Sequence, residues 1–173
     1  LRHLLSHTAG TTVSGFLGYA DHESQPKAVE VLKGSDLANS DPVVVDIVPS
    51  SEWRYSGGGY TVFQQAMEDA SKTDFTTLME QCVLQPVGMN SSTFAQPLPK
   101  SLWHKAASGH LADGQAMPEK FNSYAELAAA GLWCTPSDLA KFTLAVMQCQ
   151  KGGPGALLSP AASKDYLSHQ GRS

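Results

Sequence analysis

Tyr55 is the residue in this 173-residue sequence whose type and position best suit chemistry. It stands directly before Ser56 and the three glycines Gly57 to Gly59, and a helical pattern follows. A tyrosine just ahead of a helix lies near the positive end of the helix dipole, which suits general acid–base work if a cation is nearby. The glycines carry no side chains, so we expect a ligand to approach the backbone there. The alternative is a structural, half-buried tyrosine, which is a common role for this residue type.

Ser24 and Lys27 form the one literal match to the S-x-x-K motif of serine nucleophiles. In that motif serine and lysine lie one helical turn apart, so that the amine can take the hydroxyl proton. Pro26 stands between them and begins a helix, so Ser24 should lie outside it. We therefore interpret the match as coincidental. The G-x-S-x-G elbow and the Lys-Thr-Gly strand motif are absent, and the loosely similar stretch at 169–171 falls at a predicted helix end.

No metal or cofactor site is predicted from the histidines, glycines and cysteines. His3 and His7 are spaced i, i+4, but no third ligand accompanies them, so we expect two ordinary polar positions near a helix end. Residues 56–59 form a Gly-rich turn before a helix, a generic anion site that lacks the P-loop and G-x-G-x-x-G frames. The cysteines have neither zinc nor disulfide spacing, and we expect three small buried hydrophobes: Cys82, Cys134 and Cys149.

Composition indicates a globular chain with about one domain's length. The formal net charge of −4 favours neither nucleic acid nor an anionic membrane surface as a partner. No apolar run approaches the ~18 residues of a membrane span, and no signal peptide is visible. The chain begins at Leu1, inside an apolar-periodic segment and without Met, so we expect a piece of a longer protein.

Hydrophobic periodicity predicts a mainly helical chain with long loops and few strands. Residues 42–49, bounded by prolines, could form a short strand or an extended connector. Helices are expected over 1–7, 26–32, 62–70, 75–83, 136–149 and 160–167. Two of these have a predicted N-cap, which is Thr73 or Asp74 in one and Thr135 in the other. The last one is expected to start at Ser159-Pro160. The expected helical core consists of Phe63, Met67, Phe75, Leu78, Leu139 and Phe142. On the helix over 136–149, the face expected to be buried consists of Leu139, Phe142, Val146 and Cys149.

Four segments, in order, resemble the class C β-lactamase-like serine hydrolases, a family that includes β-lactamases, DD-peptidases and esterases. Residues 1–10 are similar to "LRHLLSHTSG", and residues 53–60 to "W-x-YSN-x-GY". Residues 84–94 are similar to "PLGM-x-x-T-x-F", and residues 130–142 to "AGLWSTPSDLARF". The resemblance covers residues 1 to about 160.

The resemblance implies a role for each matching position. Tyr55 matches the family tyrosine, which faces the serine nucleophile and its lysine and moves the proton during acylation. Ser56 and Gly57 follow it as substrate-binding positions, and Gly57 replaces the motif's asparagine. That departure fits an esterase-like member better than a lactamase. The family's S-x-x-K and Lys-Thr-Gly motifs would lie before Leu1 and after Ser173.

These implications define what we expect of the chain. Residues 1–173 should form a single incomplete domain, the helical part of the α+β β-lactamase fold without most of its antiparallel sheet. The parent would be a serine hydrolase acting on an ester or amide through an acyl-enzyme, and the isolated chain should be inactive. It should self-associate through surface left bare by the missing sheet. The resemblance is compatible with a periplasmic or secreted protein. The alternative is a non-catalytic binding or scaffolding relative, motivated by Gly57.

Overall fold

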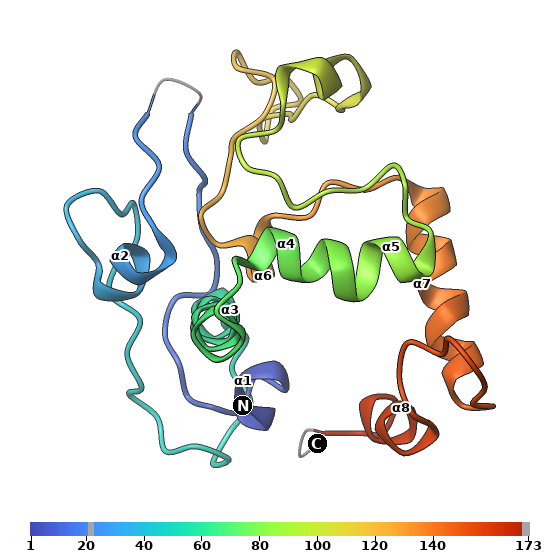
Figure 1. The fold of residues 1–173 in the computed structure, drawn as a ribbon. Coiled ribbons are helices and arrows are strands. Elements are labelled where there is room, and N and C mark those ends of the chain that lie inside the picture. Colours follow the sequence, from blue (N-terminus) through green and yellow to red (C-terminus); the bar gives the residue numbers. More distant parts are fainter. Residues whose placement is uncertain (21–22, 171–173) are drawn as a thin grey trace.

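The fold is mainly α-helical, as the hydrophobic pattern predicts (Figure 1). The computed structural model describes residues 1–20 and 23–170. Within these ranges extended pairing is limited to isolated antiparallel bridges. The helical elements are α1 (Arg2–Leu5), α2 (Ala28–Lys33), α3 (Gly57–Ser71), α4 (Phe75–Met79), the π-helix η1 (Glu80–Leu84), α5 (Gln85–Val87), the 3-10 helix η2 (Lys100–Lys105), α6 (Leu127–Ala130), α7 (Pro136–Cys149) and α8 (Pro160–Tyr166).

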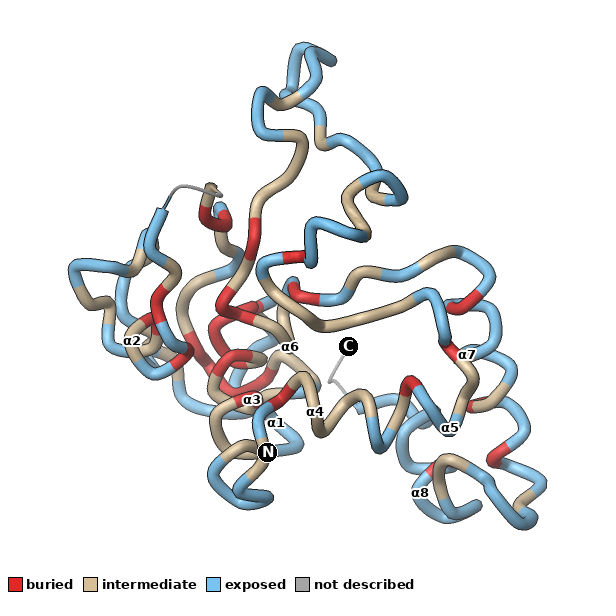
Figure 2. Tube along the Cα trace, turned by 45° about the horizontal axis from the view of Figure 1, so that its top comes forward, coloured by how far each residue is buried: buried red, intermediate tan, exposed pale blue. Residues whose placement is uncertain are grey.

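Helix α3 is the centre of the fold and packs against α1, α2, α4 and α6. Figure 2 shows buried positions gathered around α3 and α6, whereas α7 and α8 are largely exposed. The α3–α6 contact is partly polar, because Gln64 donates to the carbonyl of Ala125 at 3.2 Å and accepts from the amide of Ala128 at 3.1 Å. This pairing satisfies a buried side-chain amide and ties residues 61 or more positions apart.

The helix expected over 75–83 forms, but a π-turn interrupts it. Asp74 caps α4 by accepting from the amide of Thr77 at 2.9 Å, as predicted. From Glu80 to Leu84 the chain is π-helical, which changes the angular spacing of side chains along the helix. The prediction of a buried Cys82 is therefore wrong: Cys82 is exposed and Leu84 is buried instead.

Helix α7 begins as predicted, but its expected buried stripe is only partly buried. Thr135 accepts from the amide of Asp138 at 3.2 Å, and Val146 and Cys149 are buried. The prediction for Leu139 is wrong, because this side chain is 50% exposed. The reason is tertiary: among the described elements α7 packs against α5 and α8 only, which cover part of its circumference. Cys134, just before α7, is also exposed, contrary to expectation.

The other predicted core residues differ in how far they are buried. Phe75 is buried, whereas Phe63, Met67, Leu78 and Phe142 are only partly buried. The proline-bounded stretch 42–49 is an extended connector, paired at a single bridge between Val45 and Thr11.

The third and fourth motif segments meet at a polar joint on α7. Asp138 is buried and accepts from the amide of Ser91 at 2.7 Å and from the hydroxyl of Ser92 at 2.9 Å. The Lys141 ammonium donates to Asp138 and to the carbonyl of Gly88, both at 2.7 Å. Lys141, the largest contributor, holds the pKa of the Asp138 carboxyl below its usual value.

Candidate functional site

Tyr55 lies on a loop, and the residue before it, Arg54, fixes that loop in place through its hydrogen bonds. The guanidinium of Arg54 donates to the carbonyls of Thr11 at 3.1 Å and Gly10 at 2.7 Å, and pairs with the carboxylate of Asp46. The Arg54 amide donates to the carbonyl of His7 at 2.9 Å. These bonds tether the loop to the stretch that follows α1.

Ser56 fixes the loop on the other side of Tyr55 by capping α3. Its hydroxyl accepts from the amide of Gly59 at 2.9 Å and donates to the carbonyl of Thr12 at 2.6 Å. Ser56 is 1% exposed, so its side chain belongs to the interior. Substrate contact by Ser56 and Gly57 stays a prediction, and the hydrogen bonds seen assign the Ser56 hydroxyl to holding the turn.

The three glycines of α3 pack against residues 11–16 of the chain itself. A Cβ atom at Gly58 would lie 2.7 Å from the carbonyl oxygen of Thr12, and one at Gly59 would lie 2.8 Å from the Thr11 hydroxyl. The amides of Gly57 and Gly58 donate to carbonyls of this segment. The turn therefore has no free amide cradle of the kind an anion requires, and the glycines are explained by close packing.

Tyr55 presents its ring to solvent on one side and to His7 on the other. It is 52% exposed, and its ring centroid lies 4.5 Å from that of His7 at an interplanar angle of 38°. Tyr60 and Trp53 contact the same imidazole, at centroid distances of 5.3 Å and 5.8 Å. His7 also accepts from the amide of Ser56 at 3.2 Å through Nδ1. Sequence reasoning treated His7 as an ordinary polar position and so missed this cluster.

The other candidates that we discounted on sequence grounds have structural roles or no partner at Tyr55 among the described contacts. Lys27 is the N-cap of α2, so Ser24 lies outside that helix as expected. His3 binds the hydroxyl of Thr8 at 3.0 Å, and no group of three potential metal ligands occurs in residues 1–20 and 23–170. His169 follows α8, and Gly171 lies outside the described residues.

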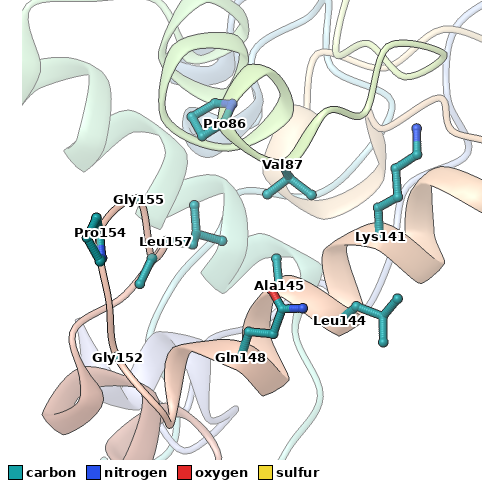
Figure 3. A pocket seen from close by; sticks show the side chains of 11 residues that line it. Pro86, Val87, Lys141, Leu144, Ala145, Gln148, Gly152, Pro154, Gly155 and Leu157 are labelled. Atoms are coloured by element: carbon teal, nitrogen blue, oxygen red, sulfur yellow. The ribbon is translucent and has the colours of Figure 1, made fainter.

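A separate pocket of about 360 Å³ lies between α5, α7 and the loop after α7 (Figure 3). Its lining combines apolar side chains such as Pro86, Val87 and Leu144 with polar groups, including Gln148. Lys141 reaches its rim, but the ammonium is already bound to Gly88 and Asp138. Tyr55 is not among the residues that line this pocket.

The helical fold corresponds to part of the β-lactamase fold seen in solved structures. A family model described as "Beta-lactamase" matches residues 1–172. The chain belongs to this β-lactamase family. A search of curated proteins finds no match. None of the described helices has the length and hydropathy of a membrane span.

Solved structures share this fold at low sequence identity. The octameric penicillin-binding protein homologue from Pyrococcus abyssi is 23% identical, with a TM-score of 0.68 over 97% of this chain and 38% of its own. The D-amino acid amidase from Ochrobactrum anthropi SV3 is 19% identical, with a TM-score of 0.70 over 94% of this chain and 44% of its own. The penicillin binding protein from Bacillus halodurans is 22% identical, with a TM-score of 0.67 over 96% of this chain and 49% of its own. The chain thus spans less than half the length of each of these structures.

Proposed function

We propose that the chain is part of a serine hydrolase that acts on an ester or amide through an acyl-enzyme, with Tyr55 moving the proton. The observation that carries this proposal is the position of Tyr55 in its motif. Its ring is half exposed while Arg54 and Ser56, on either side, are both hydrogen bonded. Such a phenol is accessible to a reacting group and held in orientation, as a general acid–base residue requires.

The nucleophile and its lysine are proposed to come from outside these 173 residues, which would make the chain a single incomplete domain. The proposal is supported by the place of Ser24 outside α2, because it shares no helical turn with Lys27, the N-cap of that helix. Without the nucleophile the chain cannot form an acyl-enzyme, because covalent catalysis needs an activated nucleophile. We therefore expect the isolated chain to be inactive.

Activity-based labelling tests where the nucleophile lies. The 173-residue chain should resist a fluorophosphonate probe and show no turnover of a chromogenic ester or a β-lactam. Covalent labelling of any serine in this chain would overturn the external-nucleophile proposal. The full-length protein that carries this chain should be labelled on a serine of its S-x-x-K motif.

A matched pair of variants in the full-length protein tests the role of Tyr55. Tyr55→Phe should lower kcat/KM by about 10²–10⁴-fold, the range for loss of a general acid–base group. Tyr60→Phe is the control, because its hydroxyl donates to the carbonyl of Leu5 in the same cluster. Equal effects of the two substitutions would mean that Tyr55 serves structure only.

The second candidate is a non-catalytic binding relative, and one packing observation favours it. A Cβ atom at Gly57 would lie 3.2 Å from both the Phe16 ring and the carbonyl of Ser14. The position that carries asparagine in the family motif is therefore closed over by residues 14–16. An intact S-x-x-K motif in the full-length sequence supports the enzyme, and its loss supports the binder.

Self-association is proposed on separate grounds. The Pyrococcus abyssi homologue is described as octameric. Here α7 presents Leu139, Leu144 and Met147 to solvent, each at least 50% exposed. Apolar groups on one helix favour association because contact removes them from water. Sedimentation velocity should give an s-value that rises with concentration, and a constant monomer value would contradict the proposal.

A further inference from the structure

His7 holds the chain on both sides of Tyr55. Its carbonyl accepts from the amide of Arg54 at 2.9 Å, and its Nδ1 accepts from the amide of Ser56 at 3.2 Å. Its ring lies against the ring of Tyr55 itself. A single residue, 48 positions away in sequence, thus contacts the tyrosine and both of its neighbours.

The backbone of His7 is shaped for this arrangement. Its φ of 57° is left-handed, a region in which histidine, asparagine and aspartate are enriched among non-glycine residues. The turn redirects the chain immediately after α1 and its C-cap, Ser6. The position therefore combines a backbone constraint with a side chain that can accept a hydrogen bond.

The hydrogen bond from Ser56 requires a particular state of the imidazole. Because Nδ1 accepts this hydrogen bond, it must be unprotonated, so the neutral ring carries its hydrogen on Nε2. Burial lowers the pKa of His7 below its usual value, which favours this neutral form near pH 7. Protonation would turn Nδ1 into a donor that faces the Ser56 amide, and the hydrogen bond would be lost.

The groups around the imidazole do not offset the lowering of the His7 pKa by burial. Tyr55 and Tyr60 face the ring, and burial raises the pKa of Tyr60, which keeps that phenol neutral. Tyr166 of α8 lies near Tyr60, and His3 of α1 binds Thr8 and Ser50. The charged groups on the Tyr55 loop are Arg54, which is paired with Asp46, and Glu52. Desolvation alone shifts the pKa of His7.

We propose that His7 is a positioning residue for Tyr55, and that the neutral imidazole holds the Tyr55–Ser56 turn while its protonation releases it. The consequence for catalysis rests on the proposed function: proton transfer through Tyr55 should weaken as acidification charges His7. The structural coupling between His7, Tyr55 and Ser56 does not depend on any hydrolytic activity.

The coupling is measured by nuclear magnetic resonance on the unmodified ¹⁵N-labelled chain. Near pH 7.5 the ring nitrogens of His7 should report a protonated Nε2 and an unprotonated Nδ1. As the pH falls, the Ser56 amide and the Tyr55 ring signals should shift with the midpoint of the His7 titration. A protonated Nδ1 in the neutral ring, or Tyr55 signals that stay constant through that titration, would overturn the proposal.

Two variants separate the acceptor from the ring. His7→Asn keeps an acceptor near the position of Nδ1 and suits the left-handed backbone, so the Ser56 amide should stay protected from exchange while the pH-dependent shift of Tyr55 disappears. His7→Phe keeps the ring but lacks the acceptor, so protection of that amide should fall about fivefold. His104→Asn, at an exposed position on η2, is the control and should retain the unmodified behaviour.

The outcomes distinguish this proposal from the proposed function. If His7→Phe does not fold, the titration of the unmodified chain and His7→Asn still decide the matter. Retention of the pH-dependent Tyr55 shift in His7→Asn would overturn the coupling. Full activity of Tyr55→Phe in the full-length protein would overturn the proposed function and leave the measured coupling intact.

Discussion

The carboxylate of Asp138 accepts a hydrogen bond from the backbone amide of Ser91 at 2.7 Å, across 47 residues of sequence. It simultaneously binds Ser92 and Lys141, and its side chain is 3% exposed. Asp138 thus does more than stabilise the start of α7: it fastens the loop after α5 to that helix. The first α7 turn is the joint between two motif segments that are remote in sequence.

Asp138→Asn should lower the melting temperature at pH 7, because asparagine cannot accept all of these bonds with a negative charge. Lys141 and the backbone depress the pKa of Asp138, so its stabilisation is present above the usual carboxyl pKa and is lost as pH falls through the lowered value. In thermal unfolding, the difference in melting temperature between Asp138→Asn and the unmodified chain should therefore become smaller at acid pH. Asp36→Asn, at an exposed position, should leave the melting temperature unchanged at both pH values.

Glu126→Gln should stabilise the chain at neutral pH by about 1–2 kcal/mol, since a buried charge without a partner is unfavourable. Glu126 is fully buried, and among the described residues no cation pairs with it and the hydroxyl of Tyr19 is the only side-chain group that acts on its carboxylate. Burial raises its pKa, so the stability it contributes is complete below the usual carboxyl pKa and is lost as pH rises through the raised value. In denaturant unfolding, Glu126→Gln should have a higher free energy of unfolding than the unmodified chain at pH 8 but not at pH 4. A benefit of equal size at pH 4 would contradict this explanation.

Gly58→Ala should destabilise the chain by about 1–3 kcal/mol, the usual effect of overpacking. The new Cβ would lie 2.7 Å from the carbonyl oxygen of Thr12 and 2.9 Å from Val43, and a backbone atom cannot move aside cheaply. The higher helix propensity of alanine acts in the opposite direction but is smaller, at about 1 kcal/mol. Gly15→Ala is the matched control, because nothing lies within 4 Å of its Cβ. Equal unfolding free energies for both variants would show that the α3 turn is loosely packed.

Phe75→Ala should reduce the free energy of unfolding by about 3–5 kcal/mol, the usual loss for a buried phenylalanine. Phe75 is 3% exposed and its ring meets that of Phe94 edge to face at 5.4 Å. Phe142 is only partly buried, so Phe142→Ala should have a smaller effect than a fully buried site would give. Urea unfolding of the two variants compares them directly, and a larger loss for Phe142→Ala would reverse the ranking of the two sites.

Local signals in the sequence predict the helix starts well. Asp74 and Thr135 cap helices as expected, and Ser159 caps the helix expected to start there, because each side chain accepts from an amide only three residues ahead. The order of the four motif segments also predicts the family, which the match over residues 1–172 confirms. Neither inference requires knowledge of where distant segments meet.

Burial and the composition of the site depend on distant contacts. Periodicity places Cys82 and Leu139 on apolar faces, but the π-turn and the limited cover of α7 expose both. The i, i+4 spacing of His3 and His7 does not indicate that the His7 ring packs against the ring of Tyr55. A turn with left-handed φ and the docking of α1 against α3 make that contact.

The amino-acid sequence by itself determined the helical character, the capping residues, the family and the choice of Tyr55 as the candidate reactive group. These properties follow from side-chain types and short-range spacing along one chain segment. Only the tertiary structure decided that His7 holds Tyr55 and that the glycines of α3 serve packing against residues 11–16. The physical reason is that hydrogen bonds and close contacts between segments more than 40 residues apart depend on how the helices dock, which no local pattern encodes.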